Sequence, residues 1–269
     1  MKTRGFTLLE VLVSMTIVGM LCMLLANIAG GTQKVVGETT RRLDADGQAQ
    51  LVFGRMGADI AGMPRRADIP VSISLNSGTA AFTFFSEVPS VSGSRGLSVV
   101  SYCMKNDSSS GAPVKGNKTS LLRASKGLEW TDTGFMGTAA NGTPVSMSDT
   151  AVSQLTDADY DVLASGVIRM NIGCQLKDGS IPGTLAAADV SRIAAIVVTL
   201  VALDESTVKV LTPEQITAIA DTFGEAQSGK LAAGDWEATA RNPDNFPGIP
   251  RHAAAALRVY QHFFPIHSF

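Results

Sequence analysis

The sequence predicts an α+β protein: a long amino-terminal helix that begins in a membrane, an antiparallel β-sheet head packed on the second half of that helix, and additional carboxy-terminal helices. Three observations predict this fold class. An uncharged apolar run occupies residues 11–33, and apolar residues at helical spacing continue to residue 63. Beyond Pro64, short runs rich in β-branched and aromatic residues alternate with Gly, Ser and Asn.

The apolar run is long enough to cross a bilayer. The 23 residues from Val11 to Gln33 carry no formal charge, and as a helix they span roughly 35 Å against a hydrocarbon core of about 30 Å. A cleavable secretory signal has a shorter apolar region, of about 7 to 15 residues, and a small-x-small cleavage pattern that "ANIAGG" lacks. A plain signal anchor explains the length but not the carboxylate of Glu10. The basic residues Lys2 and Arg4 favour a cytoplasmic amino terminus.

The helix continues beyond the membrane segment. Val52, Met56, Ile60 and Met63 recur at intervals of 4, 4 and 3, which is one stripe of a surface helix, and Pro64 ends the pattern. One helix from Phe6 to about Gly62 would be about 85 Å long. Six charged residues of this segment lie largely off the stripe: Arg41, Arg42, Asp44, Asp46, Arg55 and Asp59.

The sequence beyond Pro64 first predicts a series of strands. Strands are expected at 70–75, 79–86, 96–105 and 119–125, the first two joined as a hairpin across "NSG". Two longer runs, 161–176 and 192–205, are predicted as the central antiparallel strands of the same sheet. Loops are predicted at 106–118 and 131–157.

Helices are predicted near the carboxy terminus. Thr212 as N-cap, Pro213 at the first helical position and Gln215 at the third form a capping box. The stretch "HAAAALRVYQHFFPI" favours a last helix that stops before Pro265. His252 and His262 would then face apart on that helix, which makes them poor co-ligands for a metal.

Composition and motifs argue against an enzyme and against a nucleic-acid-binding protein. The 269 residues are 45% hydrophobic and only 17% charged, so the chain is not disordered. A formal net charge of -2 gives no basic field for nucleic acid. The sequence contains no GxSxG, no HExxH and no P-loop.

The stretch "RGFTLLEVLVSMTIVGML" strongly resembles the amino-terminal signature of type IV prepilins and of the pseudopilins of type II secretion. The resemblance covers about 25 of the 269 residues. It implies that a prepilin peptidase cuts after Gly5 and methylates the new amino terminus at Phe6, and that Glu10 serves assembly. It divides the chain into a leader at 1–5, a transmembrane and assembly helix at 6–33, a soluble continuation at 34–63 and an extracytoplasmic head at 64–269.

The odd carboxylate has a physical explanation in this reading. An ionised side chain in a membrane helix costs on the order of 2.5 to 3.5 kcal/mol, so it seeks a partner. Cleavage after Gly5 creates a cationic amine at Phe6, one helical turn from Glu10. Within one chain the two charges can pair; between chains, Glu10 can meet a neighbour's amine and set the stagger of a filament. The resemblance implies the second arrangement.

The function implied is that of a pilin-like subunit, a minor one, assembled into a pilus or a secretion pseudopilus that serves protein transport. Its partners would be the prepilin peptidase, other pilin or pseudopilin subunits and inner-membrane lipid. It would cross the bacterial inner membrane once, with a cytoplasmic amino terminus and a periplasmic head, at the filament surface or tip. The tail "RNPDNFPGIPRHAAAALRVYQHFF" further resembles Verru_Chthon cassette protein C. The alternative is a membrane-anchored periplasmic binding domain that does not polymerise.

Two further candidate sites remain in the head. Asp157, Asp159 and Asp161 alternate like the start of a calcium loop, but Val162 and Ile168 stand where an EF-hand needs Gly and Glu. We therefore expect no cofactor, with calcium as the alternative because major pseudopilins bind it in carboxy-terminal loops. Cys103 and Cys174 are the only pair placed to form a disulfide, since Cys22 lies in the apolar run, although buried free thiols are the commoner outcome.

Overall fold

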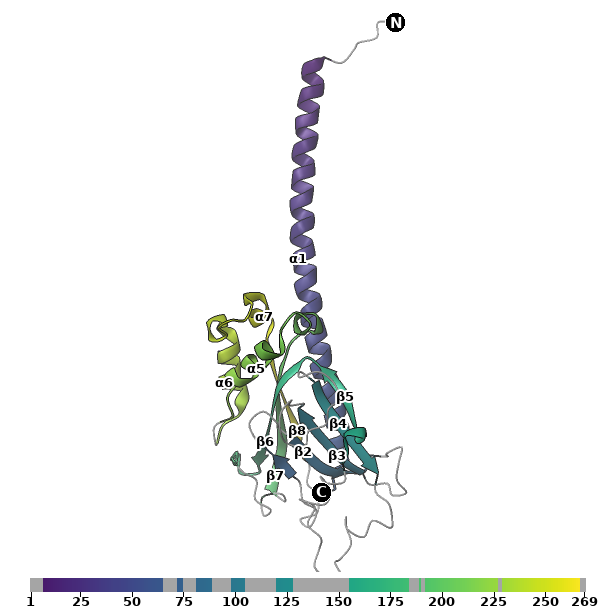
Figure 1. Ribbon diagram of the computed structural model, residues 1–269, viewed down its shortest axis with the longest axis vertical. Helices are drawn as coiled ribbons and strands as arrows, with labels where there is room; N and C mark the ends of the chain where they lie inside the picture. Colours follow the sequence, from purple (N-terminus) through teal and green to yellow (C-terminus); the bar gives the residue numbers. More distant parts are fainter. Residues whose placement is uncertain are drawn as a thin grey trace, which may run out of the picture. The chain divides into compact units, whose positions relative to one another are not determined.

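The computed structural model describes residues 7–64, 72–74, 81–88, 98–104, 120–127, 155–183, 189, 192–226 and 229–266 (Figure 1). The chain separates into two units, residues 1–43 and residues 44–269. The described part of the first unit is helical apart from Thr7. The second unit contains antiparallel sheets and further helices, which confirms the α+β class.

Helix α1 runs without interruption from Leu8 to Ala61, as the spacing predicted. Its residues in the second unit bury one stripe, at intervals of three and four, that packs against the strands. The predicted Val52, Met56, Ile60 and Met63 are all buried, and Ala45 and Ala49 extend the stripe toward the amino terminus. The glycines of this segment give it a low intrinsic helix propensity, so most of its helical stability comes from burial of the apolar stripe.

The first sheet has five antiparallel strands in sequence order. Its strands are β1 Ser72–Ser74, β2 Ala81–Ser86, β3 Ser98–Met104, β4 Ser120–Gly127 and β5 Tyr160–Ser165. The first four coincide with predicted strands, and β1 and β2 pair antiparallel as expected. The "NSG" turn between them and the predicted loop at 106–118 lie outside the described residues, as does all of the loop at 131–157 except 155–157.

The second sheet has three antiparallel strands: β6 Val167–Leu176, β7 Ile193–Ala202 and β8 Arg258–Pro265, in that order. Strand β6 alternates between buried and half-buried residues, whereas most residues of β7 are buried. The reason is that β7 contributes to two cores. Ile196, Val198 and Leu200 join the core that includes α1 and both sheets, and Val201 joins a second core with the carboxy-terminal helices.

The prediction of a single strand over 161–176 was wrong. The chain ends β5 and begins β6 at Gly166, whose φ is +108°, and the two strands belong to different sheets. The Gly166 carbonyl accepts a hydrogen bond from the Leu203 N–H at 2.8 Å. A Cβ at this position would lie 2.5 Å from the Leu203 carbonyl oxygen, so only glycine fits the break.

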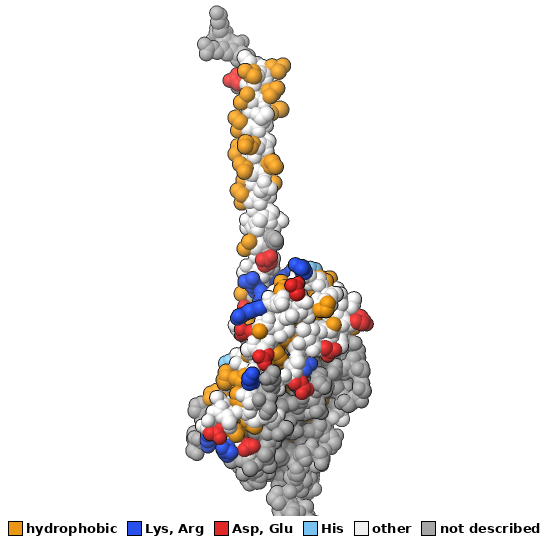
Figure 2. All heavy atoms as spheres, turned by 90° about the vertical axis from the view of Figure 1, so that its left-hand side faces the viewer, with side chains coloured by type: hydrophobic (Ala, Val, Ile, Leu, Met, Phe, Trp, Pro, Cys, Tyr) orange, Lys and Arg blue, Asp and Glu red, His pale blue; other side chains and the backbone are white. Residues whose placement is uncertain are grey.

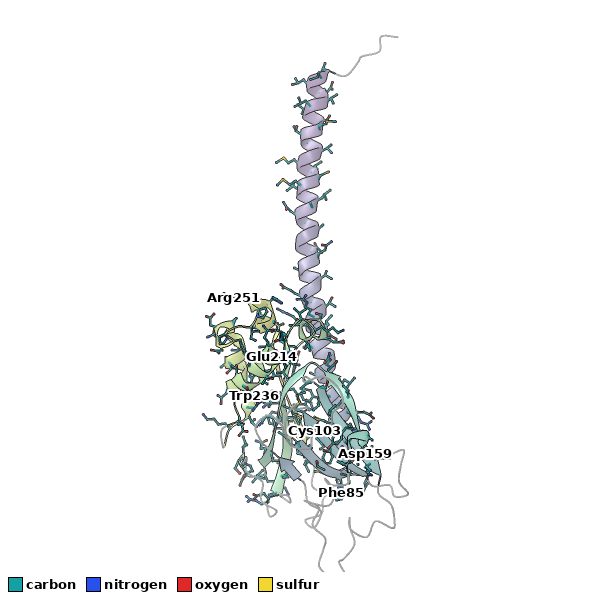
Figure 3. All side chains as sticks on the ribbon, in the orientation of Figure 1. Phe85, Cys103, Asp159, Glu214, Trp236 and Arg251 are labelled. Carbon is teal, nitrogen blue, oxygen red and sulfur yellow. The ribbon has the colours of Figure 1, made fainter. Side chains whose placement is uncertain are left out.

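Five short helical segments lie between β7 and β8: α4 Glu205–Val208, α5 Pro213–Thr222, α6 Ala232–Arg241, the 3-10 helix η3 Pro243–Asn245 and α7 Arg251–Ala256. The predicted capping box at α5 is present: the Gln215 N–H donates to Thr212 Oγ1 at 3.3 Å, and the Thr212 N–H donates to Gln215 Oε1 at 3.0 Å. Phe223 and the labelled Trp236 (Figure 3) meet edge to face in the core of this layer.

The prediction of one last helix over "HAAAALRVYQHFFPI" was also wrong. Helix α7 ends at Ala256, Leu257 is extended, and β8 then pairs with β7 from Arg258 to Pro265. Its side chains alternate, so that Tyr260, His262 and Phe264 contact α1. The β-branched and aromatic residues of this stretch suit a strand between two layers better than a helix. His252 and His262 therefore lie on different elements.

The cysteine bridge considered for the head is not formed. Cys103 in β3 and Cys174 in β6 are both buried free thiols, each in a different apolar cluster. Burial raises the pKa of each thiol to about 12. Neither thiol is a ready nucleophile, because the thiolate is the reactive form.

Candidate functional site in the amino-terminal helix

The first unit exposes an apolar helix surface that has no partner among the described residues. Every described side chain of α1 from Leu8 to Leu43 is exposed, including Leu8 at 83% and Leu9 at 73%. Figure 2 shows hydrophobic side chains along this part of the helix. Among the described residues, α1 is the one helix long and apolar enough to cross a membrane. Residues 8–33 would span about 39 Å, against about 30 Å for a hydrocarbon core.

The few hydroxyl groups in this segment are satisfied within the helix. Ser14 donates to the Val11 carbonyl at 2.8 Å, and Thr16 donates to the Val13 carbonyl at 2.7 Å. Polar groups that bond to their own backbone can enter a bilayer without leaving a donor unsatisfied. The segment therefore fits a single-pass membrane anchor, with one charged exception.

That exception is Glu10, the only formally charged residue from Thr7 to Gln33. Thr7 caps the helix start: its carbonyl and its Oγ1 accept from the Glu10 N–H at 3.0 and 3.3 Å. The spacing Thr-x-x-Glu is itself a capping signal that could have been found in the sequence. The Glu10 carboxylate is exposed and has no hydrogen-bond or ion-pair partner among the described residues. It is therefore available to a partner outside them.

The other predicted site residues of this end precede the described part of the chain. Lys2, Arg4, Gly5 and Phe6 lie before Thr7, so the structure gives no geometry for the expected cleavage site. Their roles remain predictions.

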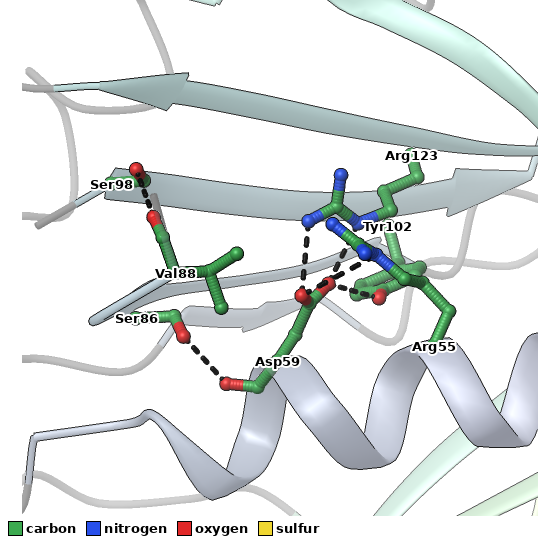
Figure 4. A network of polar contacts seen from close by, with 7 residues as sticks. All are labelled: Arg55, Asp59, Ser86, Val88, Ser98, Tyr102 and Arg123. Carbon is green, nitrogen blue, oxygen red and sulfur yellow. Dashed lines mark hydrogen bonds and ion pairs between the residues drawn. The ribbon is translucent and has the colours of Figure 1, made fainter. Parts of the chain in front are cut away.

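The head contains a buried polar network that sequence reasoning missed. Asp59, expected among the charges off the apolar stripe, is fully buried. Arg123 of β4 donates to it at two points, Nε to Oδ2 at 2.7 Å and Nη2 to Oδ1 at 3.0 Å. Tyr102 of β3 donates its hydroxyl to Oδ2, and Arg55 adds a contact at 3.6 Å (Figure 4). Both carboxylate oxygens accept from donors of the head. We call this network of Asp59 and its donors the Asp59 joint, because it connects α1 to β3 and β4.

The electrostatics of this joint follow from burial and from Asp59. Burial raises the pKa of Tyr102, and the hydrogen bond to Asp59 raises it further. For Arg123, burial works to lower the pKa, but the bond to Asp59 and its charge outweigh burial and raise it. Both donors therefore keep their protons, and the carboxylate keeps its bonds. Ser86 also donates to the Asp59 carbonyl at 2.7 Å, which ties the end of α1 to β2.

Two further aspartates of α1 bond within the head. Asp44 Oδ2 accepts from the backbone N–H of Glu205, at the start of α4, at 3.1 Å. Asp46 Oδ1 accepts from the Tyr260 hydroxyl of β8 at 2.5 Å. With Asp59, three carboxylates of one helix connect it to three different parts of the head.

The calcium site proposed from sequence receives no support from the geometry. Asp159, labelled in Figure 3, ends the 3-10 helix η1 Asp157–Asp159 and accepts from the Thr156 N–H at 2.7 Å and from its Oγ1 at 2.8 Å. Asp161 lies on β5 opposite Arg123. The described residues contain no group of three or more His, Cys, Asp or Glu that could hold a metal ion. The side chain of Asp157 is outside them.

Comparison with known families finds a match to the amino-terminal signature. The prokaryotic N-terminal methylation motif matches residues 1–26. No curated protein and no solved structure matches the chain.

Proposed function

We propose that this chain, whose methylation motif supports a type IV prepilin-like family, is a minor pilin-like subunit that assembles through α1 into a pilus or a secretion pseudopilus. Prepilin peptidase would first remove residues 1–5. The observation that carries the proposal is the Glu10 carboxylate: it is exposed and unpartnered among the described residues, at the start of an otherwise uncharged apolar helix.

Cleavage supplies the missing partner. Hydrolysis of the bond after Gly5 gives a carboxylate on the leader and an amine on Phe6, and the amine is cationic when protonated. Thr7 Oγ1 accepts from the Glu10 N–H, whereas the Glu10 carboxylate takes part in no hydrogen bond or ion pair among the described residues. That carboxylate can instead pair with the amine of a neighbouring chain. Desolvation of the pair among packed apolar helices strengthens its electrostatic attraction and fixes the register of the two chains.

The head would then lie outside the cytoplasm on a single membrane span. Lys2 and Arg4 support a cytoplasmic amino terminus. The exposed apolar surface of α1 would pack among similar helices of other subunits. In this role the protein is a structural subunit and the substrate of a peptidase; type II secretion is one machine that it could serve.

Substitution of Glu10 tests this function. Glu10→Gln keeps the shape of the side chain and removes its charge, so we expect unchanged membrane insertion and loss of the chain from the filament fraction. Glu38→Gln is the matched control, because Glu38 is an exposed carboxylate on the same helix beyond the apolar run. Shearing of cells followed by immunoblotting of filament and membrane fractions gives the readout.

A second candidate is an anchored periplasmic binding domain that never polymerises. The observation behind this candidate is a head enlarged by the helices between β7 and β8, which pack with β6 and β7 in a second apolar core. Unchanged behaviour of Glu10→Gln in both fractions would support this alternative and overturn assembly through Glu10.

A further inference from the structure

The segment between the apolar run and the first buried residue of α1 carries two adjacent arginines without partners in the part of the chain that the structure describes. Arg41 and Arg42 are exposed, and neither has a hydrogen bond or an ion pair among the described residues. Glu38, three and four residues before them, pairs with neither. The nearest acids that follow, Asp44 and Asp46, are hydrogen-bonded within the head.

The distance from the membrane suits contact with lipid headgroups. Arg41 follows Gln33 by eight residues, which is about 12 Å along a helix. A headgroup layer is about 5 to 7 Å thick on each side of the hydrocarbon core. Side chains of a helix lean toward its amino terminus, so both arginines lean back toward the apolar run. Their long stems let the guanidinium groups reach the phosphates.

We propose that Arg41 and Arg42 bind the phosphate groups of anionic phospholipids in the leaflet next to the head. This inference rests on the membrane insertion of α1 in the proposed function, but not on polymerisation. Guanidinium groups bind phosphate oxygens through two parallel hydrogen bonds. Residues 34–43 carry three basic residues and one acid, a formal charge of +2, which complements an anionic surface. The contact sets the depth at which the helix sits.

The adjacent arginines can hold two lipids. Consecutive residues of a helix point about 100° apart, so the two guanidinium groups reach different sides of α1. An acidic patch on a neighbouring subunit is the competing partner. The position of the arginines directly after a bilayer-spanning segment favours lipid, since this surface is present before any subunit arrives.

Lipid preference of the full-length chain tests the proposal. The chain is reconstituted in nanodiscs that contain phosphatidylcholine and phosphatidylglycerol in equal amounts. Native mass spectrometry then counts the lipid molecules that stay bound to the chain when it is released from the nanodisc. We expect enrichment of phosphatidylglycerol for the unaltered chain. Arg41→Gln/Arg42→Gln should reduce this enrichment by about 25-fold, because each basic residue near an anionic surface contributes about fivefold to the binding constant.

A charge-matched control separates a local site from general attraction. Arg241→Gln/Arg251→Gln removes two exposed arginines of the head, which are 79% and 90% exposed, and should keep the enrichment. Equal enrichment in both double variants, or none in the unaltered chain, overturns the lipid site. If the Arg41/Arg42 variant keeps the phosphatidylglycerol enrichment but loses cross-linking to other subunits, the lipid site is also overturned. The two arginines then bind a protein partner. A chain that fails to enter nanodiscs contradicts the membrane anchor itself.

Discussion

Asp59 of α1 and Arg123 of β4, 64 residues apart in sequence, form a two-point ion pair inside the head, with N–O distances of 2.7 and 3.0 Å. The aspartate side chain is fully buried and the arginine side chain is 14% exposed. Replacement of both partners together by apolar residues changes the stability of a protein little. Loss of one partner alone is strongly destabilising, because it leaves the other as an unpaired buried charge.

Removal of Asp59 should therefore destabilise the head strongly. Asp59→Ala leaves Arg123 without its carboxylate, and we expect a loss of about 3 to 5 kcal/mol in the free energy of unfolding. Urea denaturation of the full chain in detergent micelles, followed by tryptophan fluorescence, measures it. The control is Glu237→Ala, which breaks an exposed pair with Arg241 and should cost less than about 1 kcal/mol. Similar midpoints for the two variants would refute a central role of the Asp59 joint.

The head should lose stability at alkaline pH. Burial raises the pKa of Tyr102 above its ordinary value of 10.0, with Asp59 as the second cause, and burial raises that of Tyr160 to about 12. The folded state thus keeps phenol protons that the unfolded state releases. The contribution of these two phenol groups to stability is fully present below about pH 10 and falls above it, by up to about 1.4 kcal/mol per pH unit for each group.

Tyr102→Phe separates this effect from general alkaline unfolding. The variant should be less stable by about 1.5 to 3 kcal/mol near neutral pH, because Asp59 loses a donor. Above pH 10 its stability should fall less steeply than that of the unaltered chain, in urea titrations at stepped pH. A slope equal to that of the unaltered chain would show that Tyr102 holds no extra proton in the folded state.

Gly166 should be irreplaceable where the chain passes between the two sheets. Gly166→Ala places a methyl group 2.5 Å from the Leu203 carbonyl at a φ of +108°, which we expect to cost about 2 to 3 kcal/mol. Gly179 has a φ of +82° and open space around it, so Gly179→Ala should cost only about 1 kcal/mol. Equal thermal midpoints for the two variants would mean that the close approach to Leu203 does not matter.

The parts of the fold that local patterns encode could be predicted from the sequence. The apolar spacing of Val52, Met56 and Ile60 encodes the buried stripe of α1, and the capping box at Thr212 encodes the start of α5. The Glu10 carboxylate stood out because a charge in an apolar run is costly. Each of these signals lies within one element.

The features that were missed depend on contacts distant in sequence. Asp59 looks like a solvated helix charge until β3 and β4 bring Tyr102 and Arg123 to it. Gly166 resembles any strand glycine until the Leu203 carbonyl approaches. The alanine-rich start of the last apolar stretch favours a helix by propensity, but pairing with β7 and packing on α1 override propensity beyond Leu257.

The mature amino terminus tests the central claim most directly. Intact-mass and peptide mass spectrometry of the chain isolated from its native membrane should show residues 1–5 removed and an N-methylated Phe6. A chain that retains Met1 to Gly5, or one cleaved near Ala29, would contradict processing as a prepilin. Glu10 would then have no new chain end to pair with.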